Sequence, residues 1–150
     1  MSQDTYLVAL KMLARRELSE AQVRQRLAKR GESQESIDAA VTRLKAERSI
    51  DDERVAGAIA RAQATGRSRG RRRVLQQIEA AGISRPIASR AVDEVFASVD
   101  PDALLSASLA KRLRGRERIA DDREFQRLFR YLSAQGFDSD RILAHLRRLQ

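Results

Sequence analysis

The residues best suited to chemistry are arginines gathered in one short stretch. The segment GRSRGRRR (66–73) contains Arg67, Arg69, Arg71, Arg72 and Arg73, and no acidic residue stands between Arg54 and Glu79. A guanidinium group is planar and permanently charged, and its fork of N–H donors fits phosphate or carboxylate oxygens. The cluster therefore predicts a negatively charged partner, either nucleic acid phosphates or an acidic protein surface.

The position of this cluster along the chain strengthens the prediction. Gly66 and Gly70 predict a flexible lead-in, and the apolar-periodic segment that follows predicts a helix with Arg72 and Arg73 near its start and outside the core. Cations at a helix start oppose the helix dipole and cost roughly 0.3–1 kcal/mol each. An anionic partner is therefore favoured over a merely solvated face.

Enzyme chemistry finds little support in the remaining residues. The chain has no cysteine and a single histidine, His145, which cannot form a zinc site alone and is expected to pack or face solvent. The acidic pairs Asp51–Asp52 and Asp121–Asp122 lie at predicted helix starts, where they serve as caps. The arginine segment lacks the G-x-x-x-x-G-K-[ST] spacing of a phosphate-binding loop. We expect no enzyme activity, catalytic residue, cofactor or metal.

The elements that carry these residues repeat along the chain. Three segments align on a glycine: 27–44 on Gly31, 78–95 on Gly82 and 132–149 on Gly136. Each predicts a helix ended by a left-handed glycine and a second helix capped by the side chain two residues later, which is Ser33, Ser84 or Asp138. Three helix–turn–helix hairpins are therefore expected.

A further helix precedes each hairpin. Leu7, Leu10 and Leu13 form an apolar stripe in the first, and Ser19 with Gln22 predicts a capping box after it. Asp51 predicts the next helix start, and Pro101 begins a helix with Leu105, Leu109 and Leu113 at four-residue spacing. We expect an all-α chain of nine helices in three tandem three-helix repeats, 1–50, 51–99 and 100–150, which form an elongated, curved array.

The charge of the chain is spread evenly. The net charge is +9, with +3 in each of 1–50, 51–98 and 99–150, and 26 of the 30 basic residues are arginine. No apolar run approaches the roughly 18–20 residues that span a bilayer, and no basic leader opens the sequence. We expect a cytoplasmic protein that does not bind membranes.

Helix-turn-helix recognition of a DNA sequence is an alternative, because the helix–glycine turn–helix pattern recurs. The second helices argue against it. SRPIASRAVDEVF offers little that reads bases, and QESIDAAVTRLKAE has mixed charge and no asparagine. Phosphate contacts with little sequence discrimination are therefore expected.

Several segments, taken in order, resemble the RecX regulators of the RecA recombinase. They are ALKMLARRELSEAQVRQRLAKRG, IDDERVA, GRRRVLQQIEAAGIS and RYLSAQGFDSDRILAHL, and together they cover nearly the whole chain. The resemblance implies tandem three-helix repeats that bind RecA filaments and curb their activities. Arg71, where the family commonly has proline, adds charge to the arginine cluster.

On this basis the expected partner is the RecA–DNA filament, with weak, nonspecific binding to DNA and a monomeric protein. The contacts are expected from Arg67, Arg69, Arg71, Arg72 and Arg73, together with Arg127 and Arg130 of the third repeat. The first repeat, where acids are interspersed with the basic residues, should contribute less. The alternative is a sequence-nonspecific DNA-binding helical protein without a recombinase partner.

Overall fold

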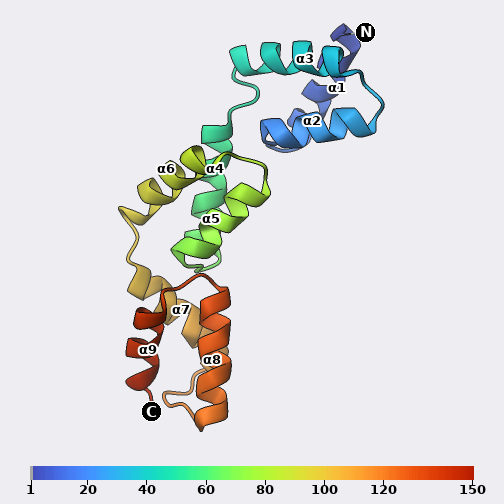
Figure 1. Ribbon diagram of the computed structural model, residues 1–150. Helices are drawn as coiled ribbons and strands as arrows, with labels where there is room; N and C mark the ends of the chain where they lie inside the picture. The colour runs from blue at the N-terminus through green and yellow to red at the C-terminus, as the bar shows by residue number, and fades with distance from the viewer. Residues whose placement is uncertain (1) are drawn as a thin grey trace. The chain divides into compact units, whose positions relative to one another are not determined.

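All regular structure in the part of the chain that is described, residues 2–150, is helical in the computed structural model (Figure 1). The helices are α1 (Ser2–Arg15), α2 (Glu20–Lys29), α3 (Gln34–Ala46), α4 (Asp52–Arg61), α5 (Arg71–Ala80), α6 (Arg85–Phe96), α7 (Pro101–Leu113), α8 (Asp122–Ala134) and α9 (Ser139–Arg147). A π-helical turn, Ala62–Gly66, continues α4. The all-α prediction is confirmed. None of these helices is long and apolar enough to cross a membrane.

The chain forms two compact units. Unit 1 consists of Met1–Ala56 and Ile78–Ala88, and unit 2 consists of Gly57–Gln77 and Ser89–Gln150. Unit 1 therefore contains α1–α3 and the turn between α5 and α6, whereas unit 2 contains the start of α5 and all of α7–α9. The division into repeats at 1–50, 51–99 and 100–150 stays a prediction.

The three aligned glycines end helices in the predicted left-handed conformation. Their φ angles are +87° at Gly31, +81° at Gly82 and +96° at Gly136. In the first turn the Glu32 amide donates to the Leu27 carbonyl at 3.2 Å. This bond satisfies a carbonyl that the end of α2 would otherwise leave free, and glycine adopts the required φ without strain from a Cβ.

Most of the predicted helix starts are confirmed. Side-chain oxygens of Ser19, Ser33, Asp51 and Asp121 each accept a bond from a first-turn amide, at 3.1, 3.1, 3.1 and 2.9 Å. Pro101 is the first residue of α7. The prediction for Asp138 is wrong in part: its backbone has the extended N-cap conformation, but its carboxylate accepts no capping bond. Asp138 is exposed, so water can bond the free amides of α9 instead.

Unit 1 has a small aliphatic core. Its buried residues are Ala9, Leu18, Val23, Leu27, Ile37, Val41, Leu44 and Ile50. The predicted stripe on α1 is only partly right, because Leu10 and Leu13 are half-buried but Leu7 is 48% exposed. The fully buried residues of α1 are the small Thr5 and Ala9, which allow α1 to pack closely on α3.

The last three helices pack through aliphatic residues in unit 2. Leu105, Leu109 and Leu113 of α7 are buried at the predicted spacing. They are joined by Leu128 and Leu132 of α8 and by Ile142 and Leu146 of α9, which are also buried. This packing holds α8 rigidly, and α8 carries much of the candidate interface described below.

The Glu124 carboxylate, in the first turn of α8, binds groups of the segment that precedes the helix. It accepts the Ala120 amide at 2.9 Å and both terminal nitrogens of Arg116, at 3.0 and 2.5 Å. Arg116 first, and the Ala120 amide second, favour the charged carboxylate and lower the pKa of Glu124 to about 2.

This carboxylate should make the stability of unit 2 sensitive to acid. Because the pKa in the folded state lies below the unfolded value of about 4.3, the stabilisation is present at neutral pH and is lost as the pH falls towards about 2. We expect Arg116→Gln to flatten the dependence of unfolding free energy on pH between about 5 and 2. Urea unfolding at a series of pH values measures this dependence. If the variant keeps the wild-type change of unfolding free energy with pH, the Arg116–Glu124 pair does not cause the acid sensitivity.

Candidate partner-binding interface

The chain at the start of α5, within the arginine segment 66–73, is bonded to the turn between α8 and α9. The Gly70 amide donates to the Gln135 carbonyl at 2.8 Å, and the Arg72 amide donates to the Gly136 carbonyl at 3.3 Å. Amides at a helix start and carbonyls at a helix end have no partner within their own helices. The positive end of α5 therefore meets the negative end of α8, and each satisfies the other.

This contact requires glycine on both sides. A Cβ at Gly70 would lie 2.6 Å from the carbonyl carbon of Gly136, and a Cβ at Gly136 would lie 2.6 Å from the Cβ of Arg73. The prediction that Gly66 and Gly70 form a flexible lead-in is therefore wrong for Gly70, which is buried against another backbone. Gly66 has open space around it and ends the π-helical turn.

Two of the clustered arginines have partners that the local sequence did not show. Arg71 forms an ion pair with Asp93 of α6, and its guanidinium lies 5.8 Å from the centre of the Phe96 ring. Arg72 donates through Nη2 to the Ser133 carbonyl at 2.6 Å. Arg71 thus has a counter-charge that is distant in sequence, because α6 folds back beside α5.

Arg72 lies between two helix ends of opposite polarity. Its cation does lie at the start of α5, but it contacts the carbonyl end of α8, where a positive charge is favourable. The local cost inferred from sequence is thus offset within unit 2. Arg72 consequently contributes to folding as well as to surface charge, and its side chain is not free.

The other arginines of the segment lie close together. Arg69 donates to the Gln63 side chain at 2.5 Å, and its pKa is lowered by burial first and then by the charges of Arg73 and Arg67. Tyr131 of α8 lies near enough to act electrostatically on Arg69. These like charges oppose one another, and a bound anion would relieve the repulsion.

The tertiary structure adds a cation that sequence analysis missed. Arg112 of α7 lies over the Tyr131 ring, 4.0 Å from its centre, and the Ser108 hydroxyl is 3.4 Å from the Tyr131 hydroxyl. We call Arg67, Arg69, Arg73, Arg112 and Tyr131 the Tyr131 cluster. Nothing in the sequence joins Arg112 to the arginine segment, because the two are separated by α6 and most of α7. The cluster offers phosphate-binding donors next to an aromatic ring.

A second basic surface lies on α8 itself. Arg123, Arg127 and Arg130 are exposed at positions i, i+4 and i+7 and line a shallow hollow of about 470 Å³ with Asp122 and Gln126. We call the three arginines the α8 stripe. Arg127 and Arg130 were predicted contacts, and Arg123 was missed although its helical spacing places it on the same face.

A larger hollow of about 700 Å³ adjoins the start of α5. Its charged lining includes Arg71, Arg72 and Arg141 and also Asp93 and Asp138, and its apolar lining includes Phe96 and Phe137. The phenylalanines offer contact to an apolar side chain of a partner. Unit 2 therefore presents a cavity suited to protein as well as cations suited to phosphate.

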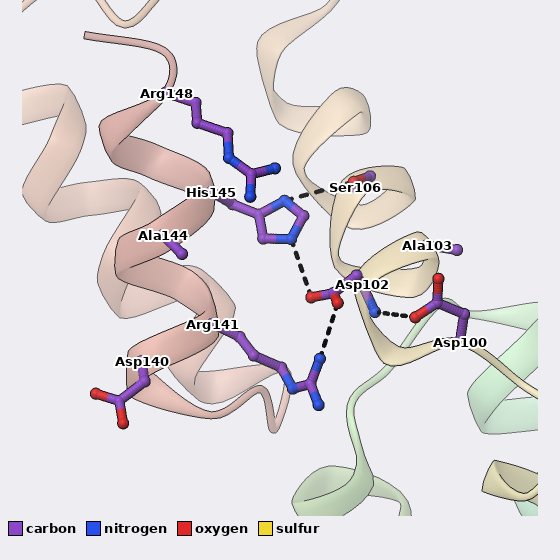
Figure 2. Close-up of a pocket in the computed structure, with 9 residues that line it drawn as sticks. All are labelled: Asp100, Asp102, Ala103, Ser106, Asp140, Arg141, Ala144, His145 and Arg148. Atoms are coloured by element: carbon purple, nitrogen blue, oxygen red, sulfur yellow. Dashed lines mark hydrogen bonds and ion pairs between the residues drawn. The ribbon is translucent and has the colours of Figure 1, made fainter.

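His145 belongs to a hydrogen-bonded group that connects α7 and α9 (Figure 2). Its Nε2 lies 3.1 Å from the Asp102 carboxylate, and its Nδ1 lies 3.5 Å from the Ser106 hydroxyl. The bond from His145, followed by that from Arg141, lowers the pKa of Asp102. A serine nucleophile beside a histidine would need free amides to stabilise an oxyanion. Ser106 is the sixth residue of α7, so the amides around it bond within the helix and are not free for this purpose. His145 is half-buried and joins α9 to α7 through its bond to Asp102, a contact that the sequence did not indicate.

The described part of the chain is thus an all-helical protein with basic surfaces on its second unit. Residues 6–44 match the sequence profile described as RecX, first three-helix domain. The regulatory protein RecX of Syntrophotalea carbinolica is 32% identical over 138 residues, which cover 91% of this chain and 90% of that protein. The regulatory protein RecX of Halorhodospira halophila is 31% identical, with 91% and 82% covered. The chain belongs to the RecX family.

Solved structures agree with this fold. A crystal structure of RecX from Lactobacillus salivarius matches 99% of this chain and 96% of its own, with a TM-score of 0.76 and 19% identity. A second crystal structure of a regulatory protein RecX matches 98% and 71% of the two chains, with a TM-score of 0.79 and 19% identity. The all-helical architecture is thus shared with proteins of little sequence identity.

Proposed function

We propose that this protein regulates the RecA recombinase, mainly as an inhibitor, by binding in the groove of the RecA–DNA filament. It would act as a cytoplasmic monomer and would lower the ATPase and strand-exchange activities of the filament. Through these activities it would modulate DNA repair and the SOS response. Membership of the RecX family supports the regulatory role. The two basic surfaces of unit 2 support a partner that combines phosphate with protein.

The Tyr131 cluster is the observation that carries this proposal. Arg69, from the segment before α5, and Arg112 of α7 both act on Tyr131 of α8, and burial first, then the charges of Arg73 and Arg67, lower the pKa of Arg69. A bound anion would offset the proximity of these like charges, which supports an anionic partner. The adjoining cavity with Phe96 and Phe137 provides apolar contact that bare DNA does not need.

The sharpest test reverses charges that folding does not use. Arg67 and Arg130 are exposed, and in residues 2–150 neither side chain has a hydrogen bond or ion pair. Arg72 and Arg73 are less suitable than the sequence predicted, because Arg72 is bonded to Ser133 and Arg73 is half-buried. Reversal at those two positions would confuse loss of binding with loss of stability.

We expect Arg67→Glu/Arg130→Glu to raise the concentration that half-inhibits the RecA ATPase on single-stranded DNA about tenfold, or about 1.4 kcal/mol. The control is Arg147→Glu/Arg148→Glu, which changes the net charge by the same amount at two exposed residues at the end of α9. The control should inhibit the ATPase as strongly as the wild type. Circular dichroism and melting temperature should be the same for all three proteins. Equal inhibition by wild type and the first variant contradicts the proposed surface.

A nonspecific DNA-binding protein would behave differently in the same assay. Wild-type inhibition should persist when bare DNA is added at constant filament concentration, because the binding site includes protein. Inhibition that disappears completely with excess DNA would favour the alternative, in which the protein only occupies DNA.

A further inference from the structure

Unit 1 contains a basic groove that plays no part in the interface described above. It lies between α1 and α2 and has a volume of about 520 Å³. Its cationic lining consists of Lys11, Arg15, Arg16, Arg26 and Arg30, and the two remaining residues are the half-buried Val8 and Met12. No acidic side chain lines the groove.

The helical geometry explains how these cations meet. Lys11 and Arg15 are four residues apart on α1, and Arg26 and Arg30 are four residues apart at the end of α2. Each pair therefore lies on one side of its helix, and packing of α1 against α2 places the pairs on either side of the groove. The helix dipole favours cations in a last turn, which accounts for Arg15 and Arg26 but not for Lys11.

Four acids of unit 1 are paired with cations outside the groove. Glu17 pairs with Arg54, Glu20 with Arg24 and Lys45, Asp38 with Arg24, and Glu47 with Arg43. None of the five groove cations has an ion pair or side-chain hydrogen bond within the described chain. Acids that are interspersed in the sequence are therefore separated from these cations in space. The expectation that the first repeat contributes less to the partner contacts stays a prediction.

The chemistry of the lining selects the kind of anion. Lysine and arginine side chains carry hydrogen-bond donors and no acceptors. A peptide brings an N–H donor at nearly every residue, and these donors would find no side-chain acceptor in this groove. A phosphodiester backbone presents only acceptors, and the apolar Val8 and Met12 can face its sugars. The groove also lacks the amide groups that read base edges, so binding should not depend on sequence.

We propose that the α1–α2 groove of unit 1 binds the phosphodiester backbone of nucleic acid, independently of base sequence. This is a second contact surface, separate from the Tyr131 cluster and the α8 stripe. It goes beyond the proposed function because it needs no recombinase. A DNA strand held by unit 1 would raise the local concentration of DNA for the basic surfaces of unit 2.

Binding to labelled oligothymidine without recombinase tests the groove in the full-length chain. Lys11→Gln/Arg26→Gln removes one cation from each side, whereas the control Lys29→Gln/Arg48→Gln removes the same charge from unit 1 outside the groove. For the groove variant, the log–log salt slope of the binding constant should fall by about 1.4, because each lost contact with a single strand contributes roughly 0.7. The control should keep the wild-type slope.

Three results would overturn the proposal. In the first, the groove variant binds DNA with the wild-type salt slope. In the second, the salt slope falls equally in the groove variant and the control, which would indicate only an effect of net charge. Poly-glutamate serves as a second probe. If the groove variant lost binding to poly-glutamate but retained its binding to DNA, the groove would be assigned to an acidic protein segment. Melting temperatures of both variants should match the wild type, because all four replaced side chains are exposed. Failure of this test leaves the ATPase test of the proposed function unaffected.

Discussion

Gly136→Ala should lower the unfolding free energy of the protein by about 3–5 kcal/mol. Its φ of +96° is strained for alanine, which accounts for about 1 kcal/mol. The new Cβ would also overlap the backbone nitrogen of Arg73 and lie 2.9 Å from its Cα. Backbone atoms cannot rotate away, so α5 must move and overpacking adds about 1–3 kcal/mol. The movement would also weaken the bonds from the Gly70 and Arg72 amides, which adds about 1 kcal/mol for the two together.

Gly31→Ala is the matched control, since it has the same left-handed conformation without the close contact. Gly31 has a φ of +87° and no atom within 4 Å of the added Cβ, so only about 1 kcal/mol of backbone strain is expected. Gly82 is intermediate, because its Cβ would lie 2.5 Å from the Cβ of Ala21. Gly82→Val, for which the sequence alone predicts more than about 1 kcal/mol, should therefore exceed that value. Urea denaturation measures the series, and equal losses at Gly31 and Gly136 would show that the α5 contact is unimportant.

Ser19→Ala should destabilise unit 1 by about 2–4 kcal/mol, an unusually large effect for removal of one hydroxyl. Ser19 is fully buried and forms a capping box with Gln22, at 3.1 and 3.0 Å. Its hydroxyl also donates to the Ala81 carbonyl at 2.5 Å. The substitution removes a helix cap, worth about 1 kcal/mol, and leaves a buried carbonyl without its partner, which costs about 1–3 kcal/mol.

Ser33→Ala separates these two contributions. Ser33 also caps a helix, accepting the Ser36 amide at 3.1 Å, but it is exposed and its bonds are confined to its own turn. Its loss should cost about 1 kcal/mol, the value of the cap alone. Chemical denaturation of the two variants gives the comparison. Similar losses at both positions would mean that the bond to Ala81 contributes nothing to stability.

Local features of this chain could be predicted because they depend on neighbouring residues. The helices, the left-handed glycines at Gly31, Gly82 and Gly136, and the caps at Ser19 and Asp51 follow from hydrogen bonds within one or two turns. Leu7 was misplaced because the helical period permits several apolar stripes, and packing on α3 selected the one that contains Thr5 and Ala9.

The candidate interface was predictable only in part. The arginine segment and the basic α8 were visible as unbalanced charge, but Arg112 and Tyr131 were not, because no local pattern joins them to α5. The role of Gly70 was misread for the same reason. A glycine before a helix suggests flexibility, whereas this one allows two backbones to approach.

By itself, the sequence determined that the chain is helical, basic and related to the RecX regulators, since these properties reside in periodicity, composition and ordered motifs. Only the tertiary structure decided which charges remain available to a partner. It pairs Arg71 with Asp93, bonds Arg72 to the end of α8, and leaves the cations of the α1–α2 groove without acids. The reason is physical: ion pairs and helix-end contacts depend on distance in space, and residues far apart in the chain become neighbours only when the helices pack.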